Sequence, residues 1–185
     1  MWSIFDHLNA LVVAPVVALI AIGAYFGLQT DRVGAVTRAA SVSALTQTVD
    51  WIERDLDNLG AGAPDSVTAV LAYDWREPSA SVTFLTGADT SLTAPAQTVR
   101  YERVPTGAGT YELRRFEVGA AGERLTARSP ATLDALDLAL LGANGASVAD
   151  GDFGAVRSVV LRLSMATDGT PVEWSQRFFL HPSSF

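Results

Sequence analysis

The first 28 residues contain the longest apolar stretch of the chain. Residues 8–28 read LNALVVAPVVALIAIGAYFGL, which is 21 residues without a formal charge. Since a helix rises about 1.5 Å per residue, this run spans roughly 30 Å, the thickness of a bilayer's hydrocarbon core. The run is too long for an ordinary cleavable signal, and no Lys or Arg precedes it. The pattern therefore predicts a membrane-spanning helix.

A second pattern extends the predicted helix from residue 30 to residue 60, a segment that we call the stalk. Apolar residues recur there at spacings of three and four, which is the a/d stripe of an amphipathic helix. We expect this stripe to pack on the protein's own sheet, because its two and a half or so heptads are short for a free coiled coil, which is the alternative. The stripe consists of Val42, Leu45, Val49, Ile52, Leu56 and Leu59.

The flanks of the stripe and the end of the helix follow from the same periodicity. The charged residues between the stripe positions are expected to face water: Asp50, Glu53, Arg54, Asp55 and Asp57. A helix from about residue 4 to residue 59 would end at Gly60-Ala-Gly-Ala-Pro64, because glycine accepts the left-handed position after a helix and proline cannot continue it.

Beyond Pro64 the apolar residues alternate with polar ones, as in strands. Thr106–Gly109 and Thr167–Pro171 have the composition of hairpin loops, so the strands are expected to form an antiparallel sheet. Residues 133–141 fit either a strand or a short helix, and residues 142–154 are expected to form a loop. The predicted strands are Val67–Asp74, Ser81–Thr86, Thr98–Val104, Tyr111–Val118, Arg157–Ala166 and Glu173–Leu180.

These patterns predict an α+β protein in which a long N-terminal helix packs on an antiparallel sheet. The organisation has three parts: a spanning helix over residues 1–29, the stalk over residues 30–60, and a β-rich domain over residues 61–185. Within the spanning helix, small residues could let a second helix approach closely, or they could be the Gly and Ala that spanning helices commonly contain. They are Ala10, Ala14, Ala18, Gly23 and Gly27, and Pro15 among them invites a kink.

Composition and motifs narrow the range of functions. The net charge of −7, with scattered Arg and no Lys, argues against a nucleic-acid partner. With no Cys and two distant His, a zinc site is not expected, and no nucleophile–base set or nucleotide-binding loop is present. We therefore predict a non-enzymatic protein without a cofactor. The loop around Asp150 and Asp152 is a weak candidate for Ca²⁺, and a solvated turn is the alternative.

The order of these segments resembles the type IV filament superfamily, and its minor pilins and pseudopilins of the PilW/GspJ-like kind in particular. Four short motifs in residues 40–180 carry the resemblance. Each motif is weak alone, and the shared order is more specific than any one of them. They are Ile52-x-x-Asp55-Leu56-x-x-x-Gly60, Val99-x-Tyr101, Leu113-x-Arg115, and the strand pair Val156–Leu163 followed by Trp174–Phe179.

The resemblance implies a structural subunit of a pilus-like or pseudopilus filament, with other pilin-like subunits as partners. Such a protein is held in the cytoplasmic membrane by its single helix and then passes into a filament at the cell surface, where the small residues and Pro15 would set helix packing. The start MWSIFDHLNALVV departs from the family's processing site. Asp6 is the candidate substitute for the glutamate that the family places near its mature start, and the alternative is an interfacial residue that lies outside the lipid.

The departure at the start keeps a second hypothesis open. The chain would then be an uncleaved bitopic membrane protein whose β domain scaffolds or senses within a cell-envelope complex. The charges that flank the apolar run, Asp6 and His7 before it and Asp31, Arg32 and Arg38 after it, specify orientation only weakly.

Overall fold

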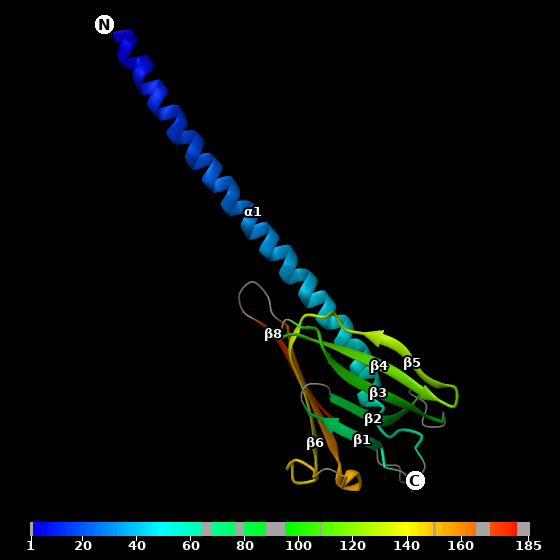
Figure 1. The fold of residues 1–185 in the computed structure, drawn as a ribbon. Coiled ribbons are helices and arrows are strands. Elements are labelled where there is room, and N and C mark those ends of the chain that lie inside the picture. Colours follow the sequence, from blue (N-terminus) through cyan, green and yellow to red (C-terminus); the bar gives the residue numbers. More distant parts are fainter. Residues whose placement is uncertain are drawn as a thin grey trace. The chain divides into compact units, whose positions relative to one another are not determined.

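The computed structural model describes residues 2–63, 68–76, 80–87, 95–107, 109–149, 151–165 and 171–180, with the backbone alone for residues 2–14. The chain consists of two compact units, Met1–Ala40 and Ser41–Phe185. A single helix, α1 (Trp2–Asp57), supplies the whole described part of the first unit and the first element of the second (Figure 1).

Helix α1 ends where the sequence predicts, within two residues. Gly60 and Gly62 have the left-handed φ values of 82° and 71° that reverse the chain after a helix. The segment that follows the helix is bonded to a strand, β2 (Ala80–Gly87), through the main chain. The Gly60 N–H donates to Leu85 O at 2.8 Å, and the Gly87 N–H donates to Asn58 O at 3.0 Å. The last turn of α1 is therefore fixed to the sheet by the main chain as well as by side chains.

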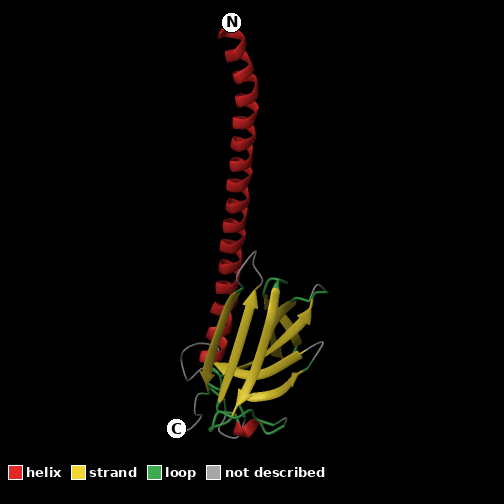
Figure 2. Ribbon diagram, turned by 90° about the vertical axis from the view of Figure 1, so that its left-hand side faces the viewer, coloured by secondary structure: helices red, strands yellow, loops and turns green. Residues whose placement is uncertain are grey.

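The second unit contains an eight-stranded sheet in which every pairing is antiparallel. The strand order is β1-β2-β3-β4-β6-β7-β8, and β5 pairs with β4. Figure 2 draws the strands as arrows. The predicted α+β class, with a helix packed on an antiparallel sheet, is confirmed. The strands are β1 (Val70–Trp75), β2 (Ala80–Gly87), β3 (Ala96–Pro105), β4 (Tyr111–Gly119), β5 (Gly122–Arg128), β6 (Leu133–Leu141), β7 (Ser158–Met165) and β8 (Val172–Phe179).

Strand β4 is the branch point of the sheet. Its second half pairs with β5 over Arg114–Gly119, whereas its first residue pairs with β6 through Tyr111 and Leu133 alone. The strands β1 to β5 and the strands β6 to β8 thus form two meanders that share one short junction. The loop between β3 and β4 is a hairpin turn, as predicted, and its Thr106 N–H donates to Thr110 O at 3.0 Å.

One strand of the sheet was not predicted, and one ambiguous segment is resolved as a strand. Strand β5 was not predicted, because GERLTAR lacks apolar alternation and six of its seven residues are exposed. Residues 133–141, which fit either a strand or a helix, form strand β6.

The predicted loop over residues 142–154 contains the start of a short 3₁₀ helix, η1 (Phe153–Ala155). The proposed turn at residues 167–170, Asp150, and the His181 end lie outside the described residues.

The core lies between the last four turns of α1 and the sheet. Leu45, Val49, Ile52, Leu56 and Leu59 of the predicted stripe are buried in it, facing apolar side chains from the strands. Val42 lies one turn before Leu45 and is 43% exposed, so it stands outside the core. Side chains from the sheet that are almost completely buried in this core include Val70, Phe84, Tyr101, Leu113, Leu133, Leu138, Leu161 and Leu163.

Candidate functional site

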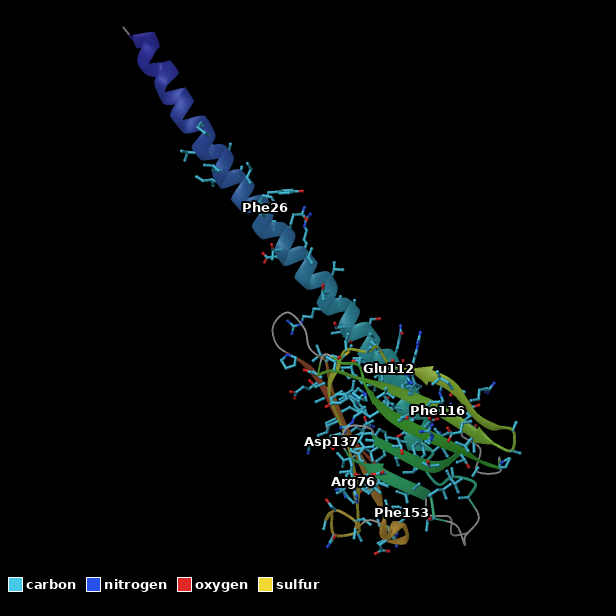
Figure 3. All side chains as sticks on the ribbon, viewed as in Figure 1. Phe26, Arg76, Glu112, Phe116, Asp137 and Phe153 are labelled. Atoms are coloured by element: carbon cyan, nitrogen blue, oxygen red, sulfur yellow. The ribbon has the colours of Figure 1, made fainter. Side chains whose placement is uncertain are left out.

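The described part of the first unit is an apolar helix with no covering element. Its large apolar side chains lie all round the axis and are 50% to 70% exposed, with Ile20 at 67% and Val36 at 70%, and Figure 3 shows Phe26 among them. Within Pro15–Asp57 an 18-residue window has a mean hydropathy of 1.3, and none of it is buried. The helix is long and apolar enough to cross a membrane. The other exposed residues of this kind are Val16, Val17, Leu19, Ile22, Tyr25, Leu28 and Val33.

The predicted assembly residues fall on this helix. Pro15 lies inside α1, which continues through it, and Ala18 is exposed. A side chain added at Gly23 or Gly27 would meet no other atom within 4 Å, so the glycines leave open space on the helix surface. The side chains of Asp6, Ala10 and Ala14 lie outside the described residues.

The second feature is a buried polar cluster in the other unit. Asp55 was expected to face water, and this prediction is wrong: the residue is only 5% exposed. The buried face of α1 is wider than a strict a/d stripe, because the sheet also covers Thr48, seven residues earlier on the same flank and 2% exposed. Asp55 therefore lies under the sheet beside Ile52 and Leu56.

Three side chains from separate elements form the Asp55 cluster, which we define as Asp55, Tyr101 and Arg115. The Arg115 guanidinium donates side-on to the carboxylate, from Nε to Oδ2 at 2.6 Å and from Nη2 to Oδ1 at 3.0 Å. The Tyr101 hydroxyl donates to the same Oδ2 at 2.7 Å. Every charge-assisted bond here joins α1 to β3 or β4, so the cluster fastens the helix to the middle of the sheet.

Packing and backbone contacts support the cluster on both sides. The Tyr101 ring is in edge-to-face contact with Trp51 of α1 and Phe84 of β2, at centroid distances of 5.4 and 5.0 Å. The buried Thr86 hydroxyl donates to Asp55 O at 2.7 Å, which satisfies a carbonyl in the last turn of the helix. The Asp55 side chain and main chain are therefore both bonded to the sheet.

An outer layer of ion pairs extends the cluster to β5. Arg115 Nη1 donates to Glu117 Oε1 at 3.1 Å and to Thr126 Oγ1 at 2.6 Å. Arg124 Nη2 donates to Glu117 Oε2 at 2.5 Å. Arg115 thus bridges a buried carboxylate on the helix and a partly exposed carboxylate on its own strand.

The protonation states follow from these contacts. Burial, followed by the neighbouring Asp55 charge, raises the pKa of Tyr101 well above its ordinary value, so the phenol stays protonated. Burial works against the Arg115 charge, but its bonds to Asp55 outweigh that effect and raise its pKa. Hydrogen bonds from Arg124 and then Arg115 lower the pKa of Glu117 from 4.5 to about 2.

A pocket of about 630 Å³ opens beside the cluster, between α1 and the β4–β5 hairpin. Among its charged groups, Asp55 and Glu117 are both bonded to Arg115, and Arg54 also lines the pocket. Within the described ranges, no three His, Cys, Asp or Glu side chains lie close enough to hold a metal ion. The pocket lining includes Trp51, Arg54, Asn58, Gln97, Thr126 and Ala127.

The three residues of the Asp55 cluster come from three of the four motifs quoted for the resemblance. Asp55 belongs to the helix motif, Tyr101 to the β3 motif and Arg115 to the β4 motif. The signal for this site was therefore present in the sequence as three separate fragments, and periodicity alone assigned Asp55 to the surface. Comparisons of the chain with protein-family models, curated proteins and solved structures find no match.

Proposed function

We propose that the protein is a structural subunit of a type IV pilus-like or pseudopilus filament, which assembles with other pilin-like subunits through its N-terminal helix. The observation that carries the proposal is the change along α1. The part up to residue 36 exposes apolar side chains all round, whereas the last four turns bury theirs under the protein's own sheet. A helix of the first kind needs lipid or other helices around it.

The Asp55 cluster supports the same function. A subunit that is pulled through its helix must transmit load from the helix to the β domain. The side-on pair between Asp55 and Arg115 and the backbone bonds of Gly60 and Gly87 provide that connection. In this proposal the apolar helix is held in the cytoplasmic membrane before assembly and in the filament core afterwards, and the β domain forms the outer surface.

Mechanical shearing of intact cells tests the proposal. The sheared filaments are pelleted, and the pellet and the membranes are probed for this chain. Recovery in the filament pellet is expected, abundant for a bulk subunit and faint for a minor or tip subunit. Signal confined to the membranes would contradict the filament proposal and would favour the bitopic envelope protein, which the spanning length of the apolar run equally supports.

A pair of variants separates anchoring from assembly. Gly23→Leu with Gly27→Leu keeps the helix apolar, so membrane insertion should persist, but it fills the open surface at both glycines. We expect the filament signal to fall at least fivefold while the membrane signal stays unchanged. The matched control is Ile22→Phe, which adds bulk about 100° away round the helix and should leave the filament signal intact. An equal loss of filament signal in both variants would mean that Gly23 and Gly27 do not belong to the assembly surface.

A further inference from the structure

Three strands of the sheet have an edge that pairs with no other described strand: β1, β5 and β8. Two of them carry irregularities that discourage further pairing. The β1 register shifts between Val70 and Ala72, and the β4–β5 register shifts at Arg115/Phe116. Strand β8 differs, because its eight residues pair with β7 without a bulge.

The direction of the β8 backbone groups follows from one hydrogen bond. Immediately after β8, the Leu180 N–H donates to Arg157 O across the β7 side at 3.1 Å. Since backbone groups alternate along a strand, those of the even-numbered residues point toward β7 and those of the odd-numbered residues point to the open edge. The open-edge residues are Glu173, Ser175, Arg177 and Phe179, and all four are exposed.

This edge is complementary to itself. When two copies of β8 run antiparallel and centre on Ser175, Ser175 faces its own copy and Glu173 faces Arg177 at both ends of the pair. All three of these pairs join open-edge residues, so each can exchange two backbone hydrogen bonds. Opposite charges lie directly across the ladder, on the same exposed face of the sheet.

Other alignments lose that match. A shift by two residues places Glu173 opposite Phe179, and a parallel alignment in register places like charges opposite each other. The antiparallel alignment centred on Ser175 satisfies the backbone and the charges at once. Charge complementarity thus favours a second copy of this chain as the occupant of the edge.

We propose that β8 is a docking surface for β8 of a second copy, in an antiparallel pair with a two-fold axis through Ser175. The contact is isologous, because each copy contributes the same residues. It joins the two sheets edge to edge and uses no residue of the apolar helix. It is therefore an association of β domains that is separate from helix-mediated assembly.

Cysteine cross-linking of the full-length chain in detergent micelles tests the proposal, since the chain has no native Cys. In the proposed pair the two Ser175 Cα atoms are about 5.5 Å apart, within disulfide range. Mild oxidation of Ser175→Cys should give a covalent dimer at least tenfold more efficiently than either of two controls. The first control is Glu173→Cys. In the proposed pair its thiols, one on each chain, would lie four residues apart along the ladder, roughly 14 Å.

The second control is Arg162→Cys, on the same face of the neighbouring strand and in register with Ser175. Its two copies would be separated by three strand spacings, roughly 14 Å. Mixing Glu173→Cys chains with Arg177→Cys chains should restore cross-linking, because those positions face each other. Equal cross-linking at positions 162, 173 and 175 would overturn the proposal.

Charge reversal tests the pairing independently of cysteine position. In the Ser175→Cys background, Glu173→Arg or Arg177→Glu alone should reduce the dimer at least fivefold, because each places like charges opposite each other. The double variant restores two opposite-charge pairs and should recover the dimer. If it does not recover, the two chains do not meet in this register.

Discussion

The carboxylate of Asp55 and the guanidinium of Arg115 meet side-on, with Nε 2.6 Å from Oδ2 and Nη2 3.0 Å from Oδ1. Their side chains are 7% and 13% exposed, so little solvent screens the pair. The helix therefore contacts the sheet through an apolar stripe and, along one flank of that stripe, through a charged bond. The apolar stripe supplies most of the burial, and the charged bond defines how the helix is positioned on the sheet.

Removing the Asp55 charge should destabilise the β domain. Asp55→Asn removes the buried counter-charge of Arg115 and leaves only the partly exposed Glu117, and we expect a loss of about 3 kcal/mol in the free energy of unfolding. Denaturant titration of the full-length chain in detergent, followed by tryptophan fluorescence, measures the change. The control is Asp50→Asn on an exposed position of the same helix, expected to change stability by about 0.5 kcal/mol or less. Similar losses at both positions would contradict a buried ion pair.

Tyr101 should resist ionisation. Because its pKa is raised, the stability that it contributes is fully present below the ordinary tyrosine pKa of about 10 and is lost as pH rises through the folded value. Absorbance titration should show one of the four tyrosines ionising only as the protein unfolds. Tyr101→Phe should remove that step. If Tyr101→Phe instead removed an ionisation step near pH 10, the Tyr101 phenol would be accessible to solvent in the folded protein.

Glu117 should make stability depend on acid pH. Its pKa is lowered from 4.5 to about 2, so its contribution is present above pH 4.5 and is lost as pH falls toward 2. Since Glu117 is partly exposed, the effect should be at most about 1 kcal/mol. Glu117→Gln should flatten the stability profile in this window and lower stability at pH 7. A profile of unchanged slope would exclude Glu117 as a source of the acid dependence.

The stripe of the stalk should contribute unequally along its length. Ile52 is 0% exposed and Val42 is 43% exposed. Ile52→Ala creates a cavity in the core and should cost about 3 kcal/mol, whereas Val42→Ala should cost less than about 1 kcal/mol. Thermal unfolding of both variants under identical conditions makes the comparison. An equal cost would mean that Val42 is covered in the folded protein.

The elements of the fold were largely predictable, because local patterns specify them. The stripe ending at Leu59 and the glycines at 60 and 62 predict where α1 ends, and alternation predicts most strands. Strand β5 was missed because an exposed edge strand has no buried face to give it a pattern. Residues 133–141 stayed ambiguous because their apolar side chains fit both periods, and pairing with β7 selects the strand.

The candidate site was predictable only in fragments. Asp55 is separated by 46 residues from Tyr101 and by 60 from Arg115, so no local pattern links them. Periodicity placed Asp55 in water because a charge beside an a/d stripe normally faces solvent. The partner that makes its burial acceptable lies on β4, and only the folded sheet brings that partner within bonding distance.

The branch at β4 has a consequence for how the chain matures during synthesis. The ribosome completes the stripe of α1 first, but the arginine that holds Asp55 emerges 60 residues later, and Arg115 lies on the strand that joins the two meanders. Until the strands that cover it are complete, the newborn helix carries this apolar stripe in addition to the exposed apolar surface of its first part. A chaperone that binds nascent apolar segments would therefore have access to this surface from the synthesis of Leu59 until the later core strands, which include β6 and β7, have followed.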